Sequence, residues 1–238
     1  MHRIGLSLLA VCLLVAGCGG TASGPPTPTI APADLSQRIA EVIRQSQSLQ
    51  FLLEFTGEPA YADPAGLFRL ISIEGGLQRP DQAIATLKVR SVAGVADVRL
   101  ISLDGQLYVT NPVTRQWTCV EQGALFDPVV LFDSSQGIDY LIRDVFENPT
   151  LMPPEEIDGV QQYHLKGQMQ GSSLIDITYG MLGLGLVEVD VWANAETLQP
   201  TRLVLVDTGT NAEDPTTWTM TFSDYDQPID IRAPITCE

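Results

Sequence analysis

The stretch Thr217-Trp218-Thr219-Met220-Thr221-Phe222 alternates a small polar residue with a large apolar one over six positions. Side chains of a strand point alternately to its two sides, so Trp218, Met220 and Phe222 share one face. A row of threonines behind a row of large apolar residues predicts a sheet with one solvated face and one buried face. The preceding segment, residues 201–206, alternates in the same way. The C-terminal part of the chain is therefore predicted to supply strands of a half-buried sheet.

Segments with the same two-residue period precede these strands along much of the chain. Between two of them, the dipeptide Asp104-Gly105 indicates a two-residue hairpin turn, because both residue types tolerate a positive φ. The predicted strands cover residues 51–56, 68–78, 83–92, 95–103, 106–110, 160–166, 186–192, 201–206 and 218–224. Nine or ten strands with short connections predict an antiparallel meander.

Helical segments interrupt the strand pattern at the start and in the middle of the chain. The first is expected to begin with Asp34 or Ser36 as its N-cap. Its apolar positions recur at helical spacing and are Leu35, Ile39, Val42, Ile43 and Leu49. The dipeptide Asp127-Pro128 predicts a short helix over residues 128–132, and residues 137–147 form another apolar helical stretch. This grouping predicts an α+β fold in which helices cover the dry face of one sheet.

Residues 1–17 are predicted to be a signal segment that is not part of the fold. A basic head precedes an apolar run over residues 4–16, which is too short for a permanent membrane span. The sequence Val15-Ala16-Gly17-Cys18 resembles the lipobox of bacterial lipoproteins, which implies that Cys18 is lipidated and becomes the new N-terminus. Residues 18–33 are uncharged and rich in Pro, Thr and Gly, and are predicted to be a tether. The alternative is an ordinary secreted protein with a chance cysteine.

The charge of the chain excludes one class of partner. The sequence has 29 acidic and 13 basic residues, a net charge of −16, and removal of residues 1–17 takes away only Arg3, which leaves 29 against 12, or −17. Nucleic-acid binding relies on clustered Lys and Arg, so nucleic acid is not an expected partner. An anionic membrane surface would also repel such a body, and the uncharged tether is expected to hold it away. Residues 34–238 are predicted to form one domain.

Two cysteines remain in the predicted domain, since Cys12 lies in the signal segment. Cys119 and Cys237 are separated by most of the second half of the chain. Outside the cytoplasm, a pair of cysteines is expected to form a disulfide rather than a metal site. Such a bridge would tie the C-terminus to the middle of the chain.

Catalytic motifs and metal-ligand spacings are not recognised in the sequence. His164 lies in an alternating segment, where a structural or surface role is expected for it. The glycines of residues 180–185 do not have the spacing of a dinucleotide-binding loop and indicate a flexible loop, with a movable cavity rim as the alternative. Carboxylates in residues 155–158 and 207–214 are interpreted as solvated loop charge. The prediction is a protein that is not an enzyme and needs no cofactor.

Several short strings occur in an order and spacing that point to one family. They are Leu103-Asp104-Gly105-Gln106-Leu107-Tyr108-Val109, Trp117, Phe126-Asp127-Pro128, Gly137, Tyr163-His164-Leu165-Lys166-Gly167, Val191-Trp192, Phe222-Ser223-Asp224-Tyr225 and Ala233-Pro234. Together with the lipobox they resemble the LppX/LprAFG lipoprotein family over about residues 34–236. The resemblance implies a LolA-like half-barrel, a strongly curved antiparallel sheet wrapped around helices with an apolar cavity between them. Catalytic residues are not part of the family pattern.

Apolar residues on the predicted dry faces are the candidates for the cavity wall. They are Leu87, Val89, Val98, Leu100, Val109, Leu131, Leu141, Ile142, Leu205, Trp218, Met220 and Phe222. Ordinary core packing is the alternative for each of them, because periodicity does not distinguish the wall of a cavity from its filling.

The resemblance also implies a function. Members of the family bind acylated lipids or glycolipids and are associated with moving them outward from the cytoplasmic membrane. We therefore expect a lipid-anchored, extracytoplasmic protein that binds such a ligand, assists its transfer across the cell envelope and meets an export or acceptor protein. An envelope sensor of the RseB type, which binds a membrane protein, is the alternative on the same fold. A structural or adhesion module with a filled core is a further alternative.

Overall fold

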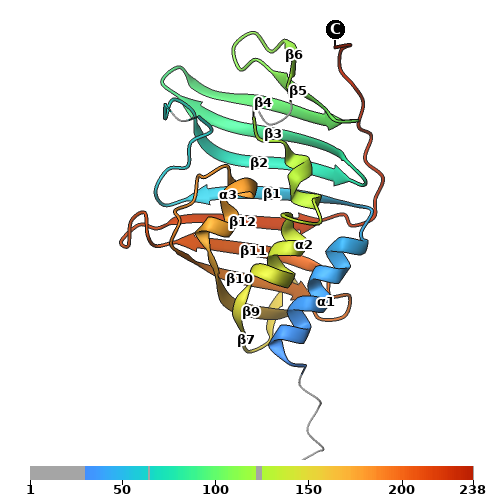
Figure 1. Ribbon diagram of the computed structural model, residues 1–238, viewed down its shortest axis with the longest axis vertical. Coiled ribbons are helices and arrows are strands. Elements are labelled where there is room, and N and C mark those ends of the chain that lie inside the picture. The colour runs from blue at the N-terminus through green and yellow to red at the C-terminus, as the bar shows by residue number, and fades with distance from the viewer. Residues whose placement is uncertain (1–29, 64, 122–124, 238) are drawn as a thin grey trace, which may run out of the picture.

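In the computed structural model, which describes residues 30–63, 65–121 and 125–237, twelve strands form one antiparallel sheet (Figure 1). The strands are β1 (Ser48–Thr56), β2 (Arg69–Gln78), β3 (Gln82–Ser91), β4 (Gly94–Leu103), β5 (Gln106–Thr110), β6 (Trp117–Val120), β7 (Glu147–Leu151), β8 (Glu155–Ile157), β9 (Val160–Gln170), β10 (Leu186–Asn194), β11 (Pro200–Asp207) and β12 (Thr216–Ser223). Their order is β6-β5-β4-β3-β2-β1-β12-β11-β10-β9-β7, with β8 paired to β9. The first and last strands therefore meet at the centre, and a meander extends from each of them.

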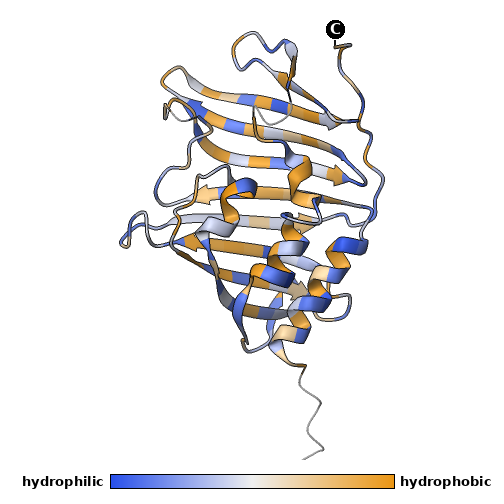
Figure 2. Ribbon diagram, in the orientation of Figure 1, coloured by the Kyte–Doolittle hydropathy of each residue, from blue (hydrophilic) through white to orange (hydrophobic). Residues whose placement is uncertain are grey.

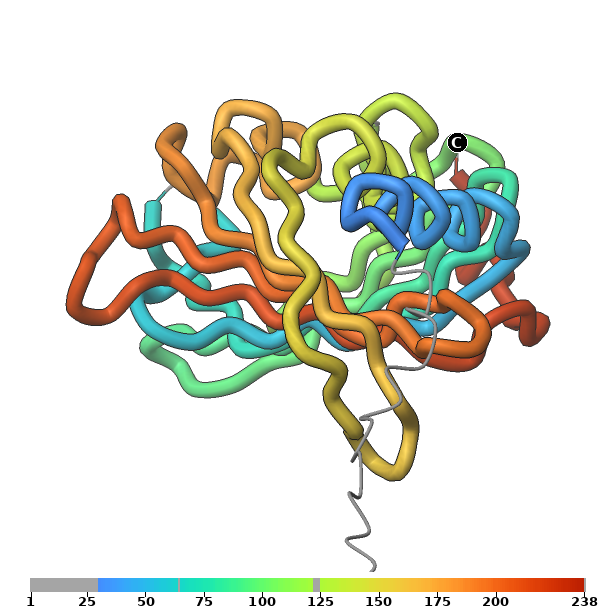
Figure 3. The backbone as a smooth tube through the Cα atoms, turned by 90° about the horizontal axis from the view of Figure 1, so that it is seen from below, coloured from blue at the N-terminus to red at the C-terminus, as the bar shows by residue number. Residues whose placement is uncertain are grey.

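Short helices cover one face of this sheet (Figure 3). They are α1 (Pro32–Gln45), η1 (Pro128–Phe132), α2 (Ile138–Tyr140), η2 (Leu141–Val145), η3 (Gly171–Leu174) and α3 (Ile175–Thr178). The sheet curves around them, so the predicted α+β architecture of an antiparallel sheet wrapped around helices is confirmed. We call this face the inner face and the opposite one the outer face.

Helix α1 begins and ends at different residues from those predicted. Its N-cap is Ala31, which makes no side-chain capping bond, and Ser36 donates instead to Ala33 O at 2.9 Å within the first turn. Asp34 lies in that turn, where its charge suits the positive end of the helix dipole. At the other end the backbone is extended from Ser46 onward, so Leu49 belongs to β1 rather than to the helix.

Several elements lack a sequence signal strong enough to predict them. Strands β6, β7 and β8 are three to five residues long, and Pro149 interrupts the alternation in β7. A proline is tolerated there because β7 lies at the edge of the sheet, where the register shifts between Glu147 and Thr150. The helical turns of η3 and α3 cover residues 171–178, for which the sequence pattern predicted no helix or strand.

The turn between β4 and β5 has the predicted conformation. Asp104 has a φ of 52° and Gly105 a φ of 76°, which match the two central positions of a hairpin turn with positive φ. The predicted cap of η1 also forms, because the Asp127 side chain accepts a hydrogen bond from Val129 N at 3.1 Å. Local residue preferences therefore determine both of these boundaries.

The chain after β12 crosses the ends of several strands and is held by specific bonds. We call residues 224–237 the C-terminal strap. Ser48 O accepts from Asp226 N at 2.9 Å, and Ile229 N donates to Gln78 Oε1 at 3.0 Å. At its far end, Cys237 is joined to Cys119 of β6 by a disulfide, with the two Cα atoms 5.8 Å apart. The strap thus connects the centre of the sheet to one edge (Figure 1).

Apolar and polar residues alternate along many of the strands (Figure 2), and the buried apolar residues of the sheet and the helices form one core cluster. Every second residue of β12 is buried, namely Thr216, Trp218, Met220 and Phe222, while the intervening threonines are half-buried. The predicted dry face is therefore the inner face of the sheet. Within the described part of the chain, no helix is long and apolar enough to cross a membrane.

Candidate functional site

An apolar cavity lies between the centre of the sheet and the helices that cover it. Its volume is about 50 Å³. The sheet contributes Phe51, Leu53, Ile73, Leu203, Leu205, Trp218 and Met220, and the covering segments contribute Phe126, Leu131, Ile138, Leu141, Ile177, Thr178 and Met181. We call residues 125–145 and 171–183 the cover. Thirteen of the fourteen lining residues are apolar, so the cavity suits an apolar ligand.

The pairing of the central strands produces the floor of the cavity. Leu53 lies opposite Ile73 on one side and opposite Met220 on the other, and Met220 lies opposite Leu203. Directly paired residues share a face, so these four side chains form one apolar row across β2, β1, β12 and β11. The two-residue period of four strands therefore builds a continuous apolar surface from segments far apart in the sequence.

Two side chains that border the cavity, Thr178 and Trp218, carry hydrogen-bond donors, and their hydrogen bonding differs. Thr178 Oγ1 donates to Leu174 O at 2.7 Å and is satisfied within its own helical turn. Trp218 is 5% exposed, and its Nε1–H has no hydrogen-bond partner among the described residues. The edge-to-face contact of its indole with Phe55, at 4.9 Å between ring centroids, holds the ring in place. Trp218 thus supplies the cavity wall with an unused donor, which is costly to bury without a partner.

The two parts of the cover meet above the cavity. The Tyr179 hydroxyl donates to Leu125 O at 2.8 Å, and its ring contacts Phe126 edge to face. Partial burial raises the pKa of the Tyr179 hydroxyl above its ordinary value. One hydrogen bond and one aromatic contact therefore join the two segments at this point.

Each part of the cover is also attached to the sheet. Ser102 of β4 donates to the Asp127 carboxylate at 3.0 Å, and this carboxylate also caps η1. On the other side, Asp207 accepts from Gly183 N at 2.6 Å and from Gly209 N at 2.9 Å. Asp207 is fully buried, so its interpretation as solvated loop charge is wrong. The glycine-containing segment 180–185 is tied to the sheet through this carboxylate.

A buried charge lies on the side of the cover that faces α1. Asp139 is fully buried, and its nearest cation is Arg143 Nη1, 3.7 Å from Asp139 Oδ2. Burial raises the pKa of the Asp139 carboxyl, although Arg79 and Arg143 act in the opposite direction. The Arg79 guanidinium donates to carbonyl oxygens of Ile43, Ser46 and Phe132 and so joins the end of α1 to η1.

Five of the twelve residues proposed from the sequence line the cavity. They are Leu131, Leu141, Leu205, Trp218 and Met220. The other seven do not border it. Leu87, Val89, Leu100, Val109, Ile142 and Phe222 are buried in the core, and Val98 is half-buried against that core. Those on β3, β4 and β5 lie on the correct face, but the cavity forms where β1, β2, β11 and β12 meet.

Sequence reasoning omitted several lining residues for two different reasons. Phe51, Leu53 and Leu203 alternate with outward-facing neighbours, and this signal could have found them. Ile177 and Met181 lie in a stretch without clear periodicity, where no such signal exists. Of the remaining candidates, Cys119 and Cys237 form the disulfide of the C-terminal strap. Cys18 lies outside the described residues.

His164 lies in a polar cluster on the outer face, away from the cavity. Its Nδ1 is 2.7 Å from Glu155 Oε1 and its Nε2 is 2.6 Å from Asp190 Oδ1, while its ring stacks on Trp192 with 4.1 Å between centroids. Hydrogen bonds from Trp192 and His164 lower the pKa of the Glu155 carboxyl. These contacts join β8, β9 and β10 and give the buried His164 side chain a structural role on the outer face.

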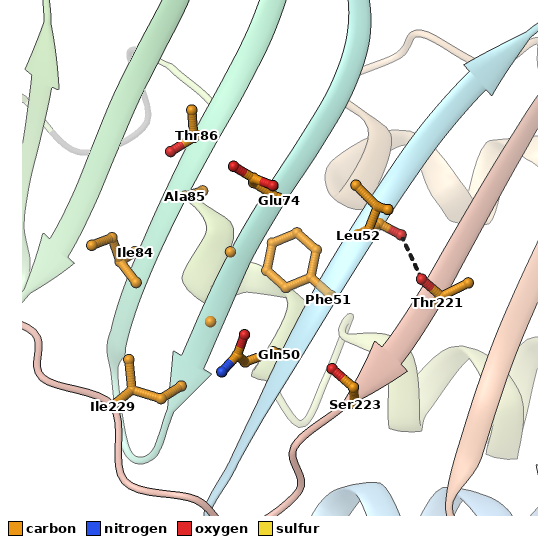
Figure 4. A pocket seen from close by; sticks show the side chains of 12 residues that line it. Gln50, Phe51, Leu52, Glu74, Ile84, Ala85, Thr86, Thr221, Ser223 and Ile229 are labelled. Carbon is orange, nitrogen blue, oxygen red and sulfur yellow. Dashed lines mark hydrogen bonds between the residues drawn. The ribbon is translucent and has the colours of Figure 1, made fainter.

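The outer face also carries a hollow of about 420 Å³ near the centre of the sheet (Figure 4). Its walls include the side chains of Gln50, Glu74 and Thr221, and Thr221 Oγ1 donates to Leu52 O at 3.5 Å. A Cβ at Gly76 would lie 2.6 Å from Ile229 Cδ1, so the absence of a side chain there lets the C-terminal strap approach the sheet. The lining of this hollow mixes polar and apolar residues and includes Ile229 of the strap, so it matches an acyl chain less well than the inner cavity does.

Comparison with known proteins relates this architecture to solved structures. The structure of LprF from Mycobacterium bovis matches with a TM-score of 0.67 and 18% identity, covering 87% of this chain and all of that one. LppX from Mycobacterium tuberculosis matches with a TM-score of 0.59 and 15% identity, covering 85% of this chain and all of that one. At these identities the likeness establishes a shared fold.

Sequence comparison adds a relative and a family. The Lipoarabinomannan carrier protein LprG of Mycolicibacterium hassiacum is 23% identical over 231 residues, which is 96% of this chain and 95% of the relative. The model of the LppX_LprAFG lipoprotein family matches residues 31–231, which include the central sheet, the cover and the cavity. The chain belongs to the LppX_LprAFG lipoprotein family.

Proposed function

We propose that this protein is a membrane-anchored, extracytoplasmic lipoprotein that binds the acyl chains of a lipid or glycolipid between its sheet and its cover. It would assist the transfer of that ligand across the cell envelope, and no chemical reaction is part of the proposal. The observation that carries it is the apolar cavity at the centre of the sheet. Membership of the lipoprotein family and similarity to a lipoarabinomannan carrier support the choice of ligand class.

The size of the cavity adds a requirement to this proposal. A volume of about 50 Å³ is well below the ~300–1,000 Å³ typical of ligand pockets. Acyl chains would therefore enter as the cover moves away from the sheet. Burial of about ten methylene groups, at ~0.8 kcal/mol each, would contribute ~8 kcal/mol toward the cost of that movement. The contacts made by Tyr179 with Leu125 and Phe126 are the ones that separate if the two parts of the cover move apart.

Trp218 suggests which part of the ligand lies deepest. Its unpaired indole N–H would donate to an oxygen of the ligand, and an ester or amide carbonyl next to an acyl chain supplies such an acceptor. The apolar residues around it would contact the hydrocarbon. A molecule with long acyl chains and one buried carbonyl therefore matches the wall better than a plain hydrocarbon does.

The anchor remains a proposal from the sequence. Cys18 would carry the acyl groups, and the uncharged residues 18–33 would connect it to the domain. Anchoring through two or more acyl chains would be stable, since a single chain holds a protein only marginally.

The test compares two adjacent positions of β1 that face opposite sides of the sheet. The wild-type mature chain is expected to retain lipid, identified by native mass spectrometry and solvent extraction, and to bind a fluorescent fatty-acyl ester. Leu53→Trp places an indole in the cavity and is expected to weaken binding of the ester at least tenfold. Leu52→Trp on the outer face is the matched control and should leave binding within twofold. Circular dichroism would verify that both variants fold.

A further variant tests the role of Trp218. Trp218→Phe keeps an aromatic ring and removes the donor, so binding of the ester should weaken about tenfold, or ~1.4 kcal/mol, while binding of an alkane probe should not change. Absence of both co-purified lipid and ester binding in the wild type would contradict the proposal. A stoichiometric membrane protein recovered in place of lipid would favour the sensor function.

A further inference from the structure

Three loops at one end of the sheet each present an exposed aliphatic side chain. Val92 at the β3–β4 turn is fully exposed, and Val113 and Leu67 expose 86% and 62% of their surface. A hollow of about 750 Å³ lies between the loops and is bordered by residues of all three, including Phe68, Ala93 and Val113. We call residues 61–63, 65–69, 88–99 and 111–117 the tip surface. In Figure 1 it lies at the left and top, away from α1.

The backbone of each tip is hydrogen-bonded by a side chain of its own loop. The Asp63 carboxylate accepts from Leu67 N at 3.0 Å and from the following N–H at 2.7 Å. Ser91 Oγ accepts from the N–H two residues later at 3.2 Å, and Asn111 Oδ1 accepts from Val113 N at 2.9 Å. These bonds fix the direction of the tips. They also reduce the cost of moving the loops out of bulk water, since the N–H groups already have partners.

The charge of the tip surface is opposite to that of the chain. The mature chain has twelve basic residues and a net charge of −17. The tip surface holds five of these basic residues and two acidic residues, so its local net charge is +3. The five are Arg69, Lys88, Arg90, Arg99 and Arg115, and all are exposed. Within the described chain, none of the five lies within 4.0 Å of a carboxylate oxygen. These cations are therefore available to an external anion.

The arrangement of these cations favours an anionic surface as the partner. Arg69 and Arg90 are directly opposite each other across β2 and β3, which is unfavourable for like charges unless an anion lies against them. Glu74 and Asp97 also border the hollow, so the hollow itself is not an anion pocket. Three of the cations lie next to the aliphatic tips, because Arg69, Arg90 and Arg115 are each two residues from Leu67, Val92 and Val113. Lys88 and Arg99 lie farther along β3 and β4. A lipid bilayer presents a planar array of phosphates above an apolar layer, so it matches both the unpaired cations and the exposed aliphatic side chains.

We propose that the tip surface docks on an anionic lipid bilayer. Leu67, Val92 and Val113 enter the interface between headgroups and acyl chains, and the neighbouring side chains of Arg69, Arg90 and Arg115 contact lipid phosphates. The local positive charge of the tip surface then sets the orientation, although Glu58, Glu213 and Asp214 lie at the same end of the sheet on the β1–β2 and β11–β12 connections. This docking is independent of the cavity and of its ligand.

The test uses the mature chain with Cys18→Ser, which has no acyl anchor, and two kinds of vesicle. Vesicles of equal parts phosphatidylcholine and phosphatidylglycerol should bind the protein at low salt and release it at high salt, and phosphatidylcholine alone should bind it weakly. Arg90→Gln with Arg115→Gln should weaken binding about 25-fold, since each basic side chain contributes about fivefold, or ~1 kcal/mol. Arg38→Gln with Arg232→Gln is the control with the same charge change on exposed residues elsewhere, and should change binding less than twofold.

A second pair of substitutions tests entry of the tips. Val92→Ser with Val113→Ser keeps the charge and should weaken binding to the mixed vesicles severalfold. The inference is overturned if the unanchored wild type does not bind mixed vesicles, if the control pair loses as much as the tip arginines, or if the serine variant binds like the wild type. Retained binding of the fatty-acyl ester in any of these cases would leave the proposed lipid-carrier function standing.

Discussion

The inner and outer faces of the sheet use alternate residues of the same strands, but they are stabilised differently. On the inner face, Leu53 and Met220 pair across β1 and β12 beneath the cover and border the cavity. One position away in each strand, Leu52 and Thr221 pair on the outer face, where the C-terminal strap crosses one end of the strands. A shift of one residue therefore separates positions held by packing from positions at a surface. Substitutions on the two faces should have unequal effects.

The largest difference is expected between adjacent residues of β1. Phe51→Ala removes a ring that is 5% exposed and should lower the free energy of unfolding by about 3–5 kcal/mol. Leu52→Ala, at a half-buried outer position, should lower it by about 1 kcal/mol or less. Urea unfolding followed by far-ultraviolet circular dichroism measures both. Equal losses for the two variants would show that the faces are not energetically distinct.

The strap should account for the next largest effect. Cys119→Ser combined with Cys237→Ser opens a connection between residues 118 positions apart, and should lower the free energy of unfolding by about 3 kcal/mol. Urea unfolding of the oxidised wild type, the double variant and the reduced wild type tests this prediction. An unfolding midpoint unchanged by both treatments would mean that the hydrogen bonds of Asp226 and Ile229 hold the strap without the disulfide.

A smaller, pH-dependent effect on stability is expected from the buried Asp139 carboxyl of the cover. Because burial raises the pKa of Asp139, the folded chain holds this proton to higher pH than the unfolded chain. The free energy of unfolding therefore falls as pH rises from the ordinary aspartate pKa through the raised one. Asp139→Asn removes this loss, so the variant should melt at a higher temperature than the wild type at pH 7.

The pH dependence of that difference supplies the control. The stability difference between Asp139→Asn and the wild type should shrink as pH approaches the ordinary aspartate pKa, where the wild-type carboxyl is protonated in the folded state. Asp144→Asn changes an exposed carboxylate that pairs with Arg143 at 2.7 Å and should not reproduce this dependence. A wild type that is more stable than the Asp139→Asn variant at pH 7 would contradict the assignment.

The same alternation that separates the faces explains what the sequence could predict. Residues 217–222 indicated a sheet with one buried face, and Trp218, Met220 and Phe222 are buried on that face. The Asp104-Gly105 turn and the cap at Asp127 were equally readable, because each depends on residues adjacent in sequence. The two-residue period of a strand, the face that it buries and the type of a tight turn can thus be predicted from residues that are close together in the sequence.

The exact position of the cavity is not local information. Leu87 and Leu205 have the same alternating context, yet only Leu205 borders the cavity. Strands β3 and β11 each lie two strands away from β1, and β3 also contacts η1 of the cover, so the difference arises from side-chain packing under the cover and not from a pattern along either strand. Strand order depends on the pairing of β1 with β12, which joins segments at opposite ends of the chain. The residues of α3 in the cover could not be found, since a single irregular turn has no period to detect.

The disulfide described above also gives the molecule a covalent ring. Cys119 and Cys237 close a loop of backbone that contains the whole cover and strands β7 to β12. A protease that cuts one peptide bond anywhere in that loop would therefore release no fragment. The nicked protein would migrate as one species on a non-reducing gel and separate into two only after reduction. A single cut within the cover would therefore leave both pieces of the chain joined.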